Sequence, residues 1–254
     1  MRLLLLLICA LARSCLSLET FVRGPSTPKP DYTKITSPIP IFGRTIDNFL
    51  ARRFRDELAK VVLTPNPNPN PNPNSKDPFP EIITLAETLN SKCQDRKLVR
   101  ALAQDVLTNC FPRWLTLLFP PLFALPFPAF TARANAWATK MFGFFLVGEG
   151  TINDVVIDGG GVGAKQGLLV TRCRFLEEAG CASICVNACK VPTEKFMLES
   201  LGVPLTMTPD YKTFECQFAF GLSPTEDEAQ EAIDTRCLSG CPRKDGGGFC
   251  DEME

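Results

Sequence analysis

Gly180-Cys181-Ala182-Ser183-Ile184-Cys185-Val186-Asn187-Ala188-Cys189-Lys190 places three cysteines at intervals of four residues. Four residues are close to one helical turn, so this spacing predicts a helix with three thiols on one side. A third interval of four residues follows near the end of the chain. Eight of the 12 cysteines lie in the last third of the sequence: Cys173, Cys181, Cys185, Cys189, Cys216, Cys237, Cys241 and Cys250.

The chain contains no histidine. This absence excludes histidine-ligated haem, histidine-bound zinc and the two-His-one-carboxylate iron site. It also excludes histidine-based acid–base chemistry and the Ser-His-Asp triad. The cysteines therefore predict an iron–sulfur or thiolate–zinc centre, unless they form disulfides in an exported protein. A third interpretation is plain core packing, because a free cysteine packs as a small apolar side chain.

The N-terminus has the pattern of a targeting sequence. Arg2 precedes ten residues, 3–12, that are almost all apolar, and Cys15-Leu16-Ser17 offers a small-x-small cleavage site. We expect residues 1–17 to be a signal peptide, too short to span a membrane. Residues 18–44 are rich in Ser, Thr and Pro with two acidic residues, which is typical of a disordered transit segment. The two together predict a plastid reached through the secretory route; the alternative is a secreted protein with a disordered stalk.

Residues 45–147 are expected to form a helical region. Apolar residues at helical spacing predict an amphipathic helix that begins near Thr45, and a second helical pattern runs from Phe79 to Asn109 with a break around Ser91. Between them, residues 65–74 repeat Pro-Asn five times, a flexible insertion that can form neither helix nor sheet. A further helix is expected over residues 134–147.

Within this region, residues 114–132 are 19 uncharged residues, interrupted by four prolines. Because proline breaks a helix, a straight membrane-spanning helix is not expected here. We favour a buried core hairpin. The alternative is an apolar surface that contacts a membrane interface or lines an apolar pocket.

After Gly148 the pattern changes to short aliphatic runs. Residues 155–157 and 168–170, joined by a glycine-rich loop, predict one hairpin, and residues 205–207 and 214–220 predict a second. No helix follows the glycine-rich loop at the spacing of a phosphate-binding loop. A net charge of −1 and a pI near 5.8 give no indication of nucleic-acid binding. The expected fold is α+β: a helical N-terminal half, then a small antiparallel sheet with a cysteine-bearing helix.

Five stretches of the sequence resemble the β-carotene isomerases of plant plastids, the Dwarf-twenty-seven-type proteins. They are residues 172–178, 180–193, 201–207, 214–218 and 237–242. The resemblance covers about residues 45–245, and it marks residues 148–245 as the cysteine-rich C-terminal domain. It implies an iron-containing protein that interconverts all-trans and 9-cis β-carotene, and it favours iron, as an iron–sulfur cluster, over disulfides.

The expected metal ligands are Cys181, Cys185, Cys189, Cys216, Cys237 and Cys241. Helix geometry limits which of them can bind the same metal centre. On a regular helix the Cα atoms of Cys181 and Cys189 would be about 12 Å apart. The sulfurs around one zinc are only about 3.8 Å apart, whereas a larger iron–sulfur cluster tolerates more spread. We expect Cys185 and one helical neighbour to bind the metal centre together with cysteines from the set Cys216, Cys237 and Cys241. Glu178, one turn before the first of these cysteines, is a candidate acid; a solvated residue or an arginine partner is the alternative.

A carotene has no polar group, so the binding of such a carotenoid substrate must come from apolar contact. The 19 phenylalanines can supply aromatic walls, and the apolar stretch predicts peripheral contact with a membrane. Two alternatives stay open. One is a non-catalytic thiolate–metal module that binds a lipid or a partner, and the other is a secreted, disulfide-stabilised protein. The sequence specifies no oligomeric state.

Overall fold

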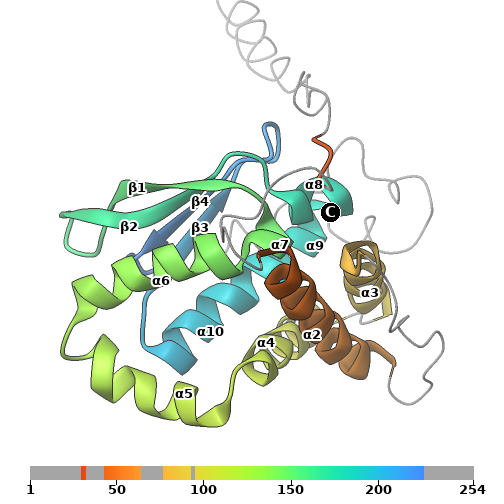
Figure 1. Ribbon diagram of the computed structural model, residues 1–254, viewed down its shortest axis with the longest axis horizontal. Helices are drawn as coiled ribbons and strands as arrows, with labels where there is room; N and C mark the ends of the chain where they lie inside the picture. Colours follow the sequence, from red (N-terminus) through yellow and green to blue (C-terminus); the bar gives the residue numbers. More distant parts are fainter. Residues whose placement is uncertain (1–29, 33–42, 64–76, 93–94, 226–254) are drawn as a thin grey trace, which may run out of the picture.

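The structure, a computed structural model, describes residues 30–32, 43–63, 77–92 and 95–225 (Figure 1). Several predictions from sequence concern parts of the chain outside these residues. They include the signal peptide 1–17, most of the segment 18–44, the Pro-Asn tract 65–74, and the cysteines Cys93, Cys237 and Cys241.

Three long helices form the N-terminal half, as predicted: α2 (Gly43–Leu63), α3 (Phe79–Lys92) and α4 (Arg96–Cys110). The expected break between α3 and α4 is confirmed, and Asp95 caps the start of α4 by accepting a hydrogen bond of 2.8 Å from the Lys97 N–H. The three helices bury their apolar faces against one another and against the later part of the chain.

The proline-interrupted stretch forms α5 (Arg113–Phe119), the π-helix η1 (Pro120–Ala124) and the start of α6 (Pro128–Phe142). Prolines lack an N–H, so the turn widens: the Leu125 N–H bonds five residues back, to the Pro120 carbonyl, at 3.0 Å. The preferred prediction of a buried core hairpin is wrong. The segment is helical and most of its large apolar side chains are exposed. After α6, the short helix α7 (Phe144–Val147) completes the region predicted as one helix over residues 134–147.

The two predicted hairpins are confirmed. β1 (Gly150–Val156) pairs with β2 (Val162–Val170), and β3 (Leu205–Pro209) pairs with β4 (Cys216–Phe220), all antiparallel. β2 also pairs with β4, which gives one four-stranded sheet of order β1-β2-β4-β3. The helical half followed by this small antiparallel sheet makes the fold α+β, as predicted.

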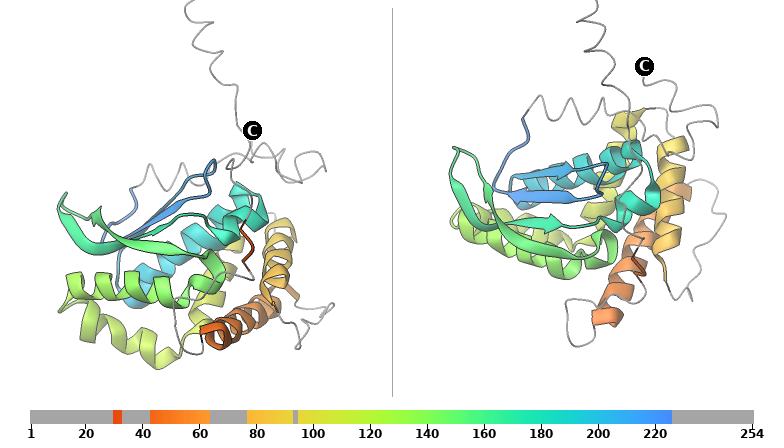
Figure 2. Two further views of the ribbon diagram at one scale, coloured as in Figure 1. Left: turned by 45° about the horizontal axis from the view of Figure 1, so that its top comes forward. Right: turned by 90° about the horizontal axis from the view of Figure 1, so that it is seen from above.

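Four short helices connect the hairpins: α8 (Arg174–Ala179), α9 (Ala182–Ile184), the π-helix η2 (Cys185–Lys190) and α10 (Val191–Leu201). Figure 1 and both views of Figure 2 show α6 and α10 along the same face of the sheet, with α3 on the opposite side of the molecule from α6. η2 and α10 pack against α4, so residues from both halves, such as Val99 and Cys185, belong to one hydrophobic core.

None of the helices among the described residues is long and apolar enough to cross a bilayer.

Candidate functional site

Four cysteines on three elements converge between the sheet and the helices. Cys173 immediately precedes α8, Cys185 and Cys189 lie on η2, and Cys216 begins β4. All four are buried, with at most 8% of each residue exposed. Cys216 is on the same face of the sheet as Phe218, which turns its thiol toward the core. We call these four residues the thiol cluster.

The helix that carries two of these thiols is wider than a regular α-helix. The Val191 N–H bonds to the Val186 carbonyl five residues back, and Pro192, which has no N–H, follows. Cys181 lies before α9 with extended backbone angles, φ −142° and ψ 121°. The three cysteines therefore do not sit on one regular helix, and the 12 Å spacing expected for that geometry does not apply.

Burial dominates the electrostatics of the thiol cluster. It raises the pKa of Cys173 to about 11, and it raises the pKa values of Cys185, Cys189 and Cys216 well above the ordinary value of a thiol. Mutual repulsion adds to this effect: the pKa of Cys185 is raised by Cys189, Cys216 and Cys173, in that order. Lys190 acts in the opposite direction on Cys185 and Cys216. Near neutral pH these groups are protonated thiols, and a metal would have to displace their protons.

A buried ion pair lies beside the thiol cluster. Lys190 Nζ is 2.7 Å from Glu194 Oε1, one turn further along, and donates a second bond of 2.7 Å to the Met207 carbonyl. Glu194 Oε1 also accepts the Met207 N–H at 2.7 Å. Both charged residues are more than 90% buried, so each depends on the other and on β3 for compensation.

The donor types of the thiol cluster suit a soft metal, but its geometry does not complete a site. Among the described residues, no three Cys, Asp or Glu side chains form a group that could hold a metal ion. The free thiols among the described cysteines include Cys110, Cys173, Cys185, Cys189 and Cys216. The disulfide alternative thus has no bridge among these five, and a metal centre would need ligands from outside the described residues, where Cys237 and Cys241 lie.

The carboxylates on α8 have different surroundings. Glu177 accepts hydrogen bonds from Arg172 Nε at 3.0 Å and from the Tyr32 hydroxyl at 2.8 Å, and its other oxygen is also bonded to Arg172. An arginine partner is the alternative interpretation given for Glu178, and the structure shows one for its neighbour Glu177. Glu178, the candidate acid, is half-buried on α8 and does not line the cavity described next.

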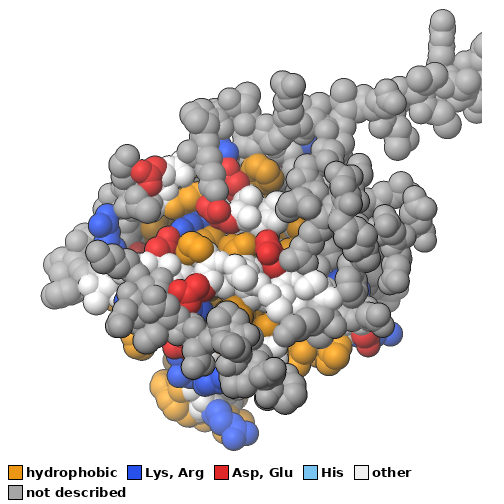
Figure 3. All heavy atoms as spheres, turned by 90° about the vertical axis from the view of Figure 1, so that its right-hand side faces the viewer, with side chains coloured by type: hydrophobic (Ala, Val, Ile, Leu, Met, Phe, Trp, Pro, Cys, Tyr) orange, Lys and Arg blue, Asp and Glu red, His pale blue; other side chains and the backbone are white. Residues whose placement is uncertain are grey.

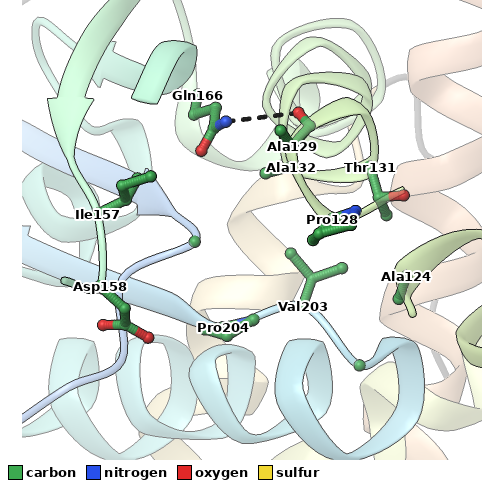
Figure 4. A pocket seen from close by; sticks show the side chains of 12 residues that line it. Ala124, Pro128, Ala129, Thr131, Ala132, Ile157, Asp158, Gln166, Val203 and Pro204 are labelled. Atoms are coloured by element: carbon green, nitrogen blue, oxygen red, sulfur yellow. Dashed lines mark hydrogen bonds between the residues drawn. The ribbon is translucent and has the colours of Figure 1, made fainter. Parts of the chain in front are cut away.

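An apolar cavity of about 300 Å³ lies between α6 and the far end of the sheet (Figure 4). Figure 4 shows Pro128, Ala129 and Ala132 of α6 on one side of it and Ile157 and Asp158 on the other, with Gln166 above and Val203 and Pro204 below. Gln166 is buried and donates a long hydrogen bond of 3.5 Å to the Ala129 carbonyl. The cavity is lined by Ala124, Pro128, Ala129, Thr131, Ala132, Ile157, Asp158, Gln166, Gly202, Val203, Pro204 and Gly221.

The cavity and the thiol cluster lie at opposite ends of one strand. Cys216 begins β4, and Gly221, which lines the cavity, follows its last residue. Five residues of extended strand separate their Cα atoms by about 17 Å. The side chains of Phe218 and Phe220 fill the interior between them, at 3% and 1% exposure.

A model of the C-terminal domain of the beta-carotene isomerase D27-like family matches residues 145–229, which include the sheet and the whole thiol cluster. Residues 145–229 thus resemble the C-terminal domain of this family. The family resemblance predicted from the cysteine-containing stretches is thereby confirmed.

Two curated plant proteins, both named chloroplastic beta-carotene isomerase D27, are similar to this chain. The one from Arabidopsis thaliana is 30% identical over 154 residues, which cover 58% of this chain and 53% of the relative. The one from Medicago truncatula is 26% identical over 171 residues, which cover 67% and 66%. The chain thus spans between about half and two thirds of the length of these relatives. No solved structure matches the chain.

Sequence reasoning missed two features of the candidate site. Cys173 lies outside the four-residue spacing that directed attention to the other cysteines. Its place shortly after β2, a strand of a predicted hairpin, could have identified it as a candidate site residue. The cavity had no sequence signal, because its lining is scattered over residues 124–221. Of the predicted ligands, the structure brings Cys185, Cys189 and Cys216 together and puts Cys181 on the buried loop before α9.

Proposed function

We propose that this protein is a plastid carotenoid isomerase that interconverts all-trans and 9-cis β-carotene. The observation that carries the proposal is the match of residues 145–229 to the D27-like C-terminal domain, together with two relatives named chloroplastic beta-carotene isomerases. Isomerisation leaves the oxidation state of the substrate unchanged, so the reaction requires no stoichiometric oxidant. We propose the secretory route to the plastid on the basis of the signal-peptide and transit-like patterns in residues 1–44.

The cavity beside α6 is the proposed site for one end of the substrate. Its walls are mainly aliphatic, so apolar area removed from water supplies the binding free energy, at about 25 cal/mol per Å². A volume of about 300 Å³ is at the lower end of the range for small-molecule sites. A long carotenoid would therefore place one terminal group in the cavity, with the remaining polyene along the apolar surface of α6 or in the bilayer.

Iron remains a proposal that rests on the thiolate-rich composition and on the family resemblance. Cys185, Cys189 and Cys216 would supply ligands together with Cys237 or Cys241, because the described thiols alone form no complete metal site. When bound, such a centre would supply one-electron chemistry. We assign no step of the reaction to it.

The separation of the cavity from the thiol cluster favours a second candidate function. A substrate in the cavity is about 17 Å, one strand length, from the thiols. The protein could then be a non-catalytic carotenoid- or lipid-binding module in which the cysteines, with or without metal, contribute only to folding.

Expression in carotene-accumulating bacteria, followed by chromatography of the extracted isomers, separates the two candidates. An isomerase changes the ratio of 9-cis to all-trans β-carotene, whereas a binding module leaves the ratio at the level of an empty-vector strain. Ala129→Trp, which would fill the mouth of the cavity, should reduce isomerisation at least tenfold. Ala101→Trp on the exposed face of α4 is the matched control and should retain activity.

Iron is tested separately, by analysis of iron and acid-labile sulfide after anaerobic purification. Cys185→Ser should remove the bound iron, because a hydroxyl is a poor substitute for a thiolate. Cys110→Ser, at a half-buried cysteine outside the thiol cluster, should retain it. A protein that isomerises β-carotene but contains no iron would remove iron from the proposal and leave the isomerase intact.

A further inference from the structure

The segment α5–η1–α6 carries a concentration of large apolar side chains that no other described element covers. Trp114 is 63% exposed, Leu117 74%, Leu125 78% and Phe130 62%. In Figure 1 and both views of Figure 2 the segment lies at the periphery of the molecule, away from α3. We call the following residues the apolar face: Trp114, Leu117, Leu118, Leu122, Phe123, Leu125, Phe127, Phe130 and Trp137.

The inner side of the same segment is anchored in the fold, so the apolar face is not a detached piece of chain. Ala132 and Ala136 on α6 are buried against the sheet, at 2% and 0% exposure. Thr131, also buried, donates a hydrogen bond of 2.9 Å to the Phe123 carbonyl and thereby ties α6 to η1. The outward stripe of Phe130, Arg133 and Trp137 follows from helical spacing on a helix with one buried side.

The charges within the sequence of this segment are all of one sign, although the exposed Asp158, on the loop after β1, lines the adjoining cavity. Residues 106–148 contain no Asp or Glu, and their charged residues are Arg113, Arg133 and Lys140. Arg113 and Arg133 are exposed. The face of the molecule at the right of Figure 1 is different, because there acidic, basic and apolar side chains are mixed, as Figure 3 shows.

The two tryptophans of the chain, Trp114 and Trp137, both belong to the apolar face and both are more than half exposed. Tryptophan is enriched at the level of lipid headgroups, where its apolar ring is buried and its N–H stays near water. Exposed tryptophan and phenylalanine beside arginine and lysine are the composition of helices that lie in the plane of a bilayer surface.

We infer that the apolar face docks on the surface of an anionic lipid bilayer, with α5 and α6 lying in the interface. Prolines at positions 120, 121, 126 and 128 prevent one continuous helix through the bilayer, which leaves the in-plane orientation. Arg113, Arg133 and Lys140 then contact anionic headgroups while the aromatic side chains enter the acyl boundary.

This orientation also places the cavity at the bilayer. Pro128 and Ala129 line the cavity and are exposed, and their neighbours Phe127 and Phe130 belong to the apolar face. An apolar molecule dissolved in the bilayer would reach the cavity without passing through water. That consequence rests on the proposed isomerase function, whereas docking itself does not.

Tryptophan fluorescence tests docking directly, because both tryptophans are on the apolar face and the apolar leader at residues 1–17 contains none. The full-length protein is titrated with vesicles of phosphatidylcholine containing phosphatidylglycerol, and with vesicles of phosphatidylcholine alone. We expect the emission to shift to shorter wavelength with the anionic vesicles, at an affinity at least tenfold higher than with the neutral ones. The difference should shrink at high salt.

Two variants and one control keep the inference open to failure. Leu117→Asp with Leu125→Asp should weaken anionic-vesicle binding at least tenfold, while Leu98→Asp, at a leucine that is 48% exposed near the start of α4, should not. Arg113→Gln with Arg133→Gln leaves the apolar side chains intact and should lower affinity for anionic vesicles only.

Three results would overturn docking on an anionic bilayer. They are unchanged emission with both kinds of vesicle, equal affinity for both, or a lipid-independent dimer by light scattering whose tryptophans are already shielded. Each can occur in a protein that isomerises β-carotene in solution, so the isomer analysis and the vesicle titration fail independently.

Discussion

The Tyr32 hydroxyl donates a hydrogen bond of 2.8 Å to Glu177 Oε2, a residue 145 positions further along the chain. Arg174 lies over the Tyr32 ring, 5.0 Å from its centroid, and Arg172 bonds the same glutamate. Residue 32 falls within the segment 18–44 that the sequence predicted to be disordered, yet it is tied to α8. The described part of that segment is therefore attached to the folded protein.

Removal of this hydroxyl should destabilise the protein. We expect Tyr32→Phe to lower the free energy of unfolding by about 1 to 2 kcal/mol, because it removes a hydrogen bond to a charged group. Urea denaturation followed by far-UV circular dichroism measures the change. Combining Tyr32→Phe with Glu177→Gln should cost less than the sum of the single changes; simple additivity would mean that the two side chains do not interact.

The buried pair Lys190–Glu194 should be the most sensitive polar contact of the fold. Lys190→Met leaves the Glu194 carboxylate buried without its cation, which we expect to cost about 3 to 5 kcal/mol of unfolding free energy. Adding Glu194→Gln removes the uncompensated charge and keeps an oxygen for the Met207 N–H, so the double variant should recover part of the loss. A double variant no more stable than Lys190→Met would contradict this assignment.

Gly167 is required by the amide pair that crosses it. Asn153 Nδ2 donates to Gln217 Oε1 at 2.7 Å, Gln217 Nε2 returns a bond of 3.1 Å, and a Cβ at Gly167 would collide with Asn153 and Val155. Gly167→Ala should therefore cost about 1 to 3 kcal/mol. Gly161→Ala is the control, because a Cβ there would meet nothing closer than 3.8 Å. Equal melting temperatures for the two variants would show that the strand yields.

Titration of the Cys110 thiol should make the stability of the protein depend on pH, and one substitution should remove this contribution. Burial, and then the Glu57 carboxylate, raise the pKa of this thiol from its ordinary value of 9.0 to about 11. A raised folded-state pKa means that its contribution to stability is fully present below pH 9 and lost between pH 9 and 11. For a partly exposed thiol this amounts to about 1 kcal/mol. Urea midpoints at pH 8 and pH 11 should therefore differ less in Cys110→Ser than in the wild-type protein, and identical differences would contradict the shift.

Elements with a strong period were predictable. The helices α2, α3 and α4 follow from apolar spacing of 3.6 residues, and their predicted boundaries lie close to those in the structure. Both hairpins follow from short aliphatic runs, although β1 and β2 begin five and six residues before the predicted runs 155–157 and 168–170. The prediction of a buried hairpin for the apolar stretch was wrong for a physical reason. Composition does not show whether a side chain such as Leu117 or Phe127 packs against another element or stays exposed. The prolines widen the turn at η1, and within this π-helix only Ala124 is buried.

The candidate site was predictable only in part. Four-residue spacing directed attention to Cys185 and Cys189, but not to the widened helix that carries them or to Cys173. These depend on where β2 and β4 meet the helices, a long-range relationship that local periodicity does not contain. The buried Lys190 would also read as a solvated charge in the sequence, since only β3 supplies its second acceptor.

Met207 lies on β3, which forms one border of the sheet, and both of its backbone hydrogen-bonding groups are occupied by side chains of the preceding helices. Border strands normally offer such groups to any extended peptide that approaches. Here the side chains of Lys190 and Glu194 make the two hydrogen bonds that a neighbouring strand would otherwise make. The sheet is thus closed to extension by a foreign strand at this position, which opposes self-association through β3, a common route to aggregation, without a charged residue on the strand itself.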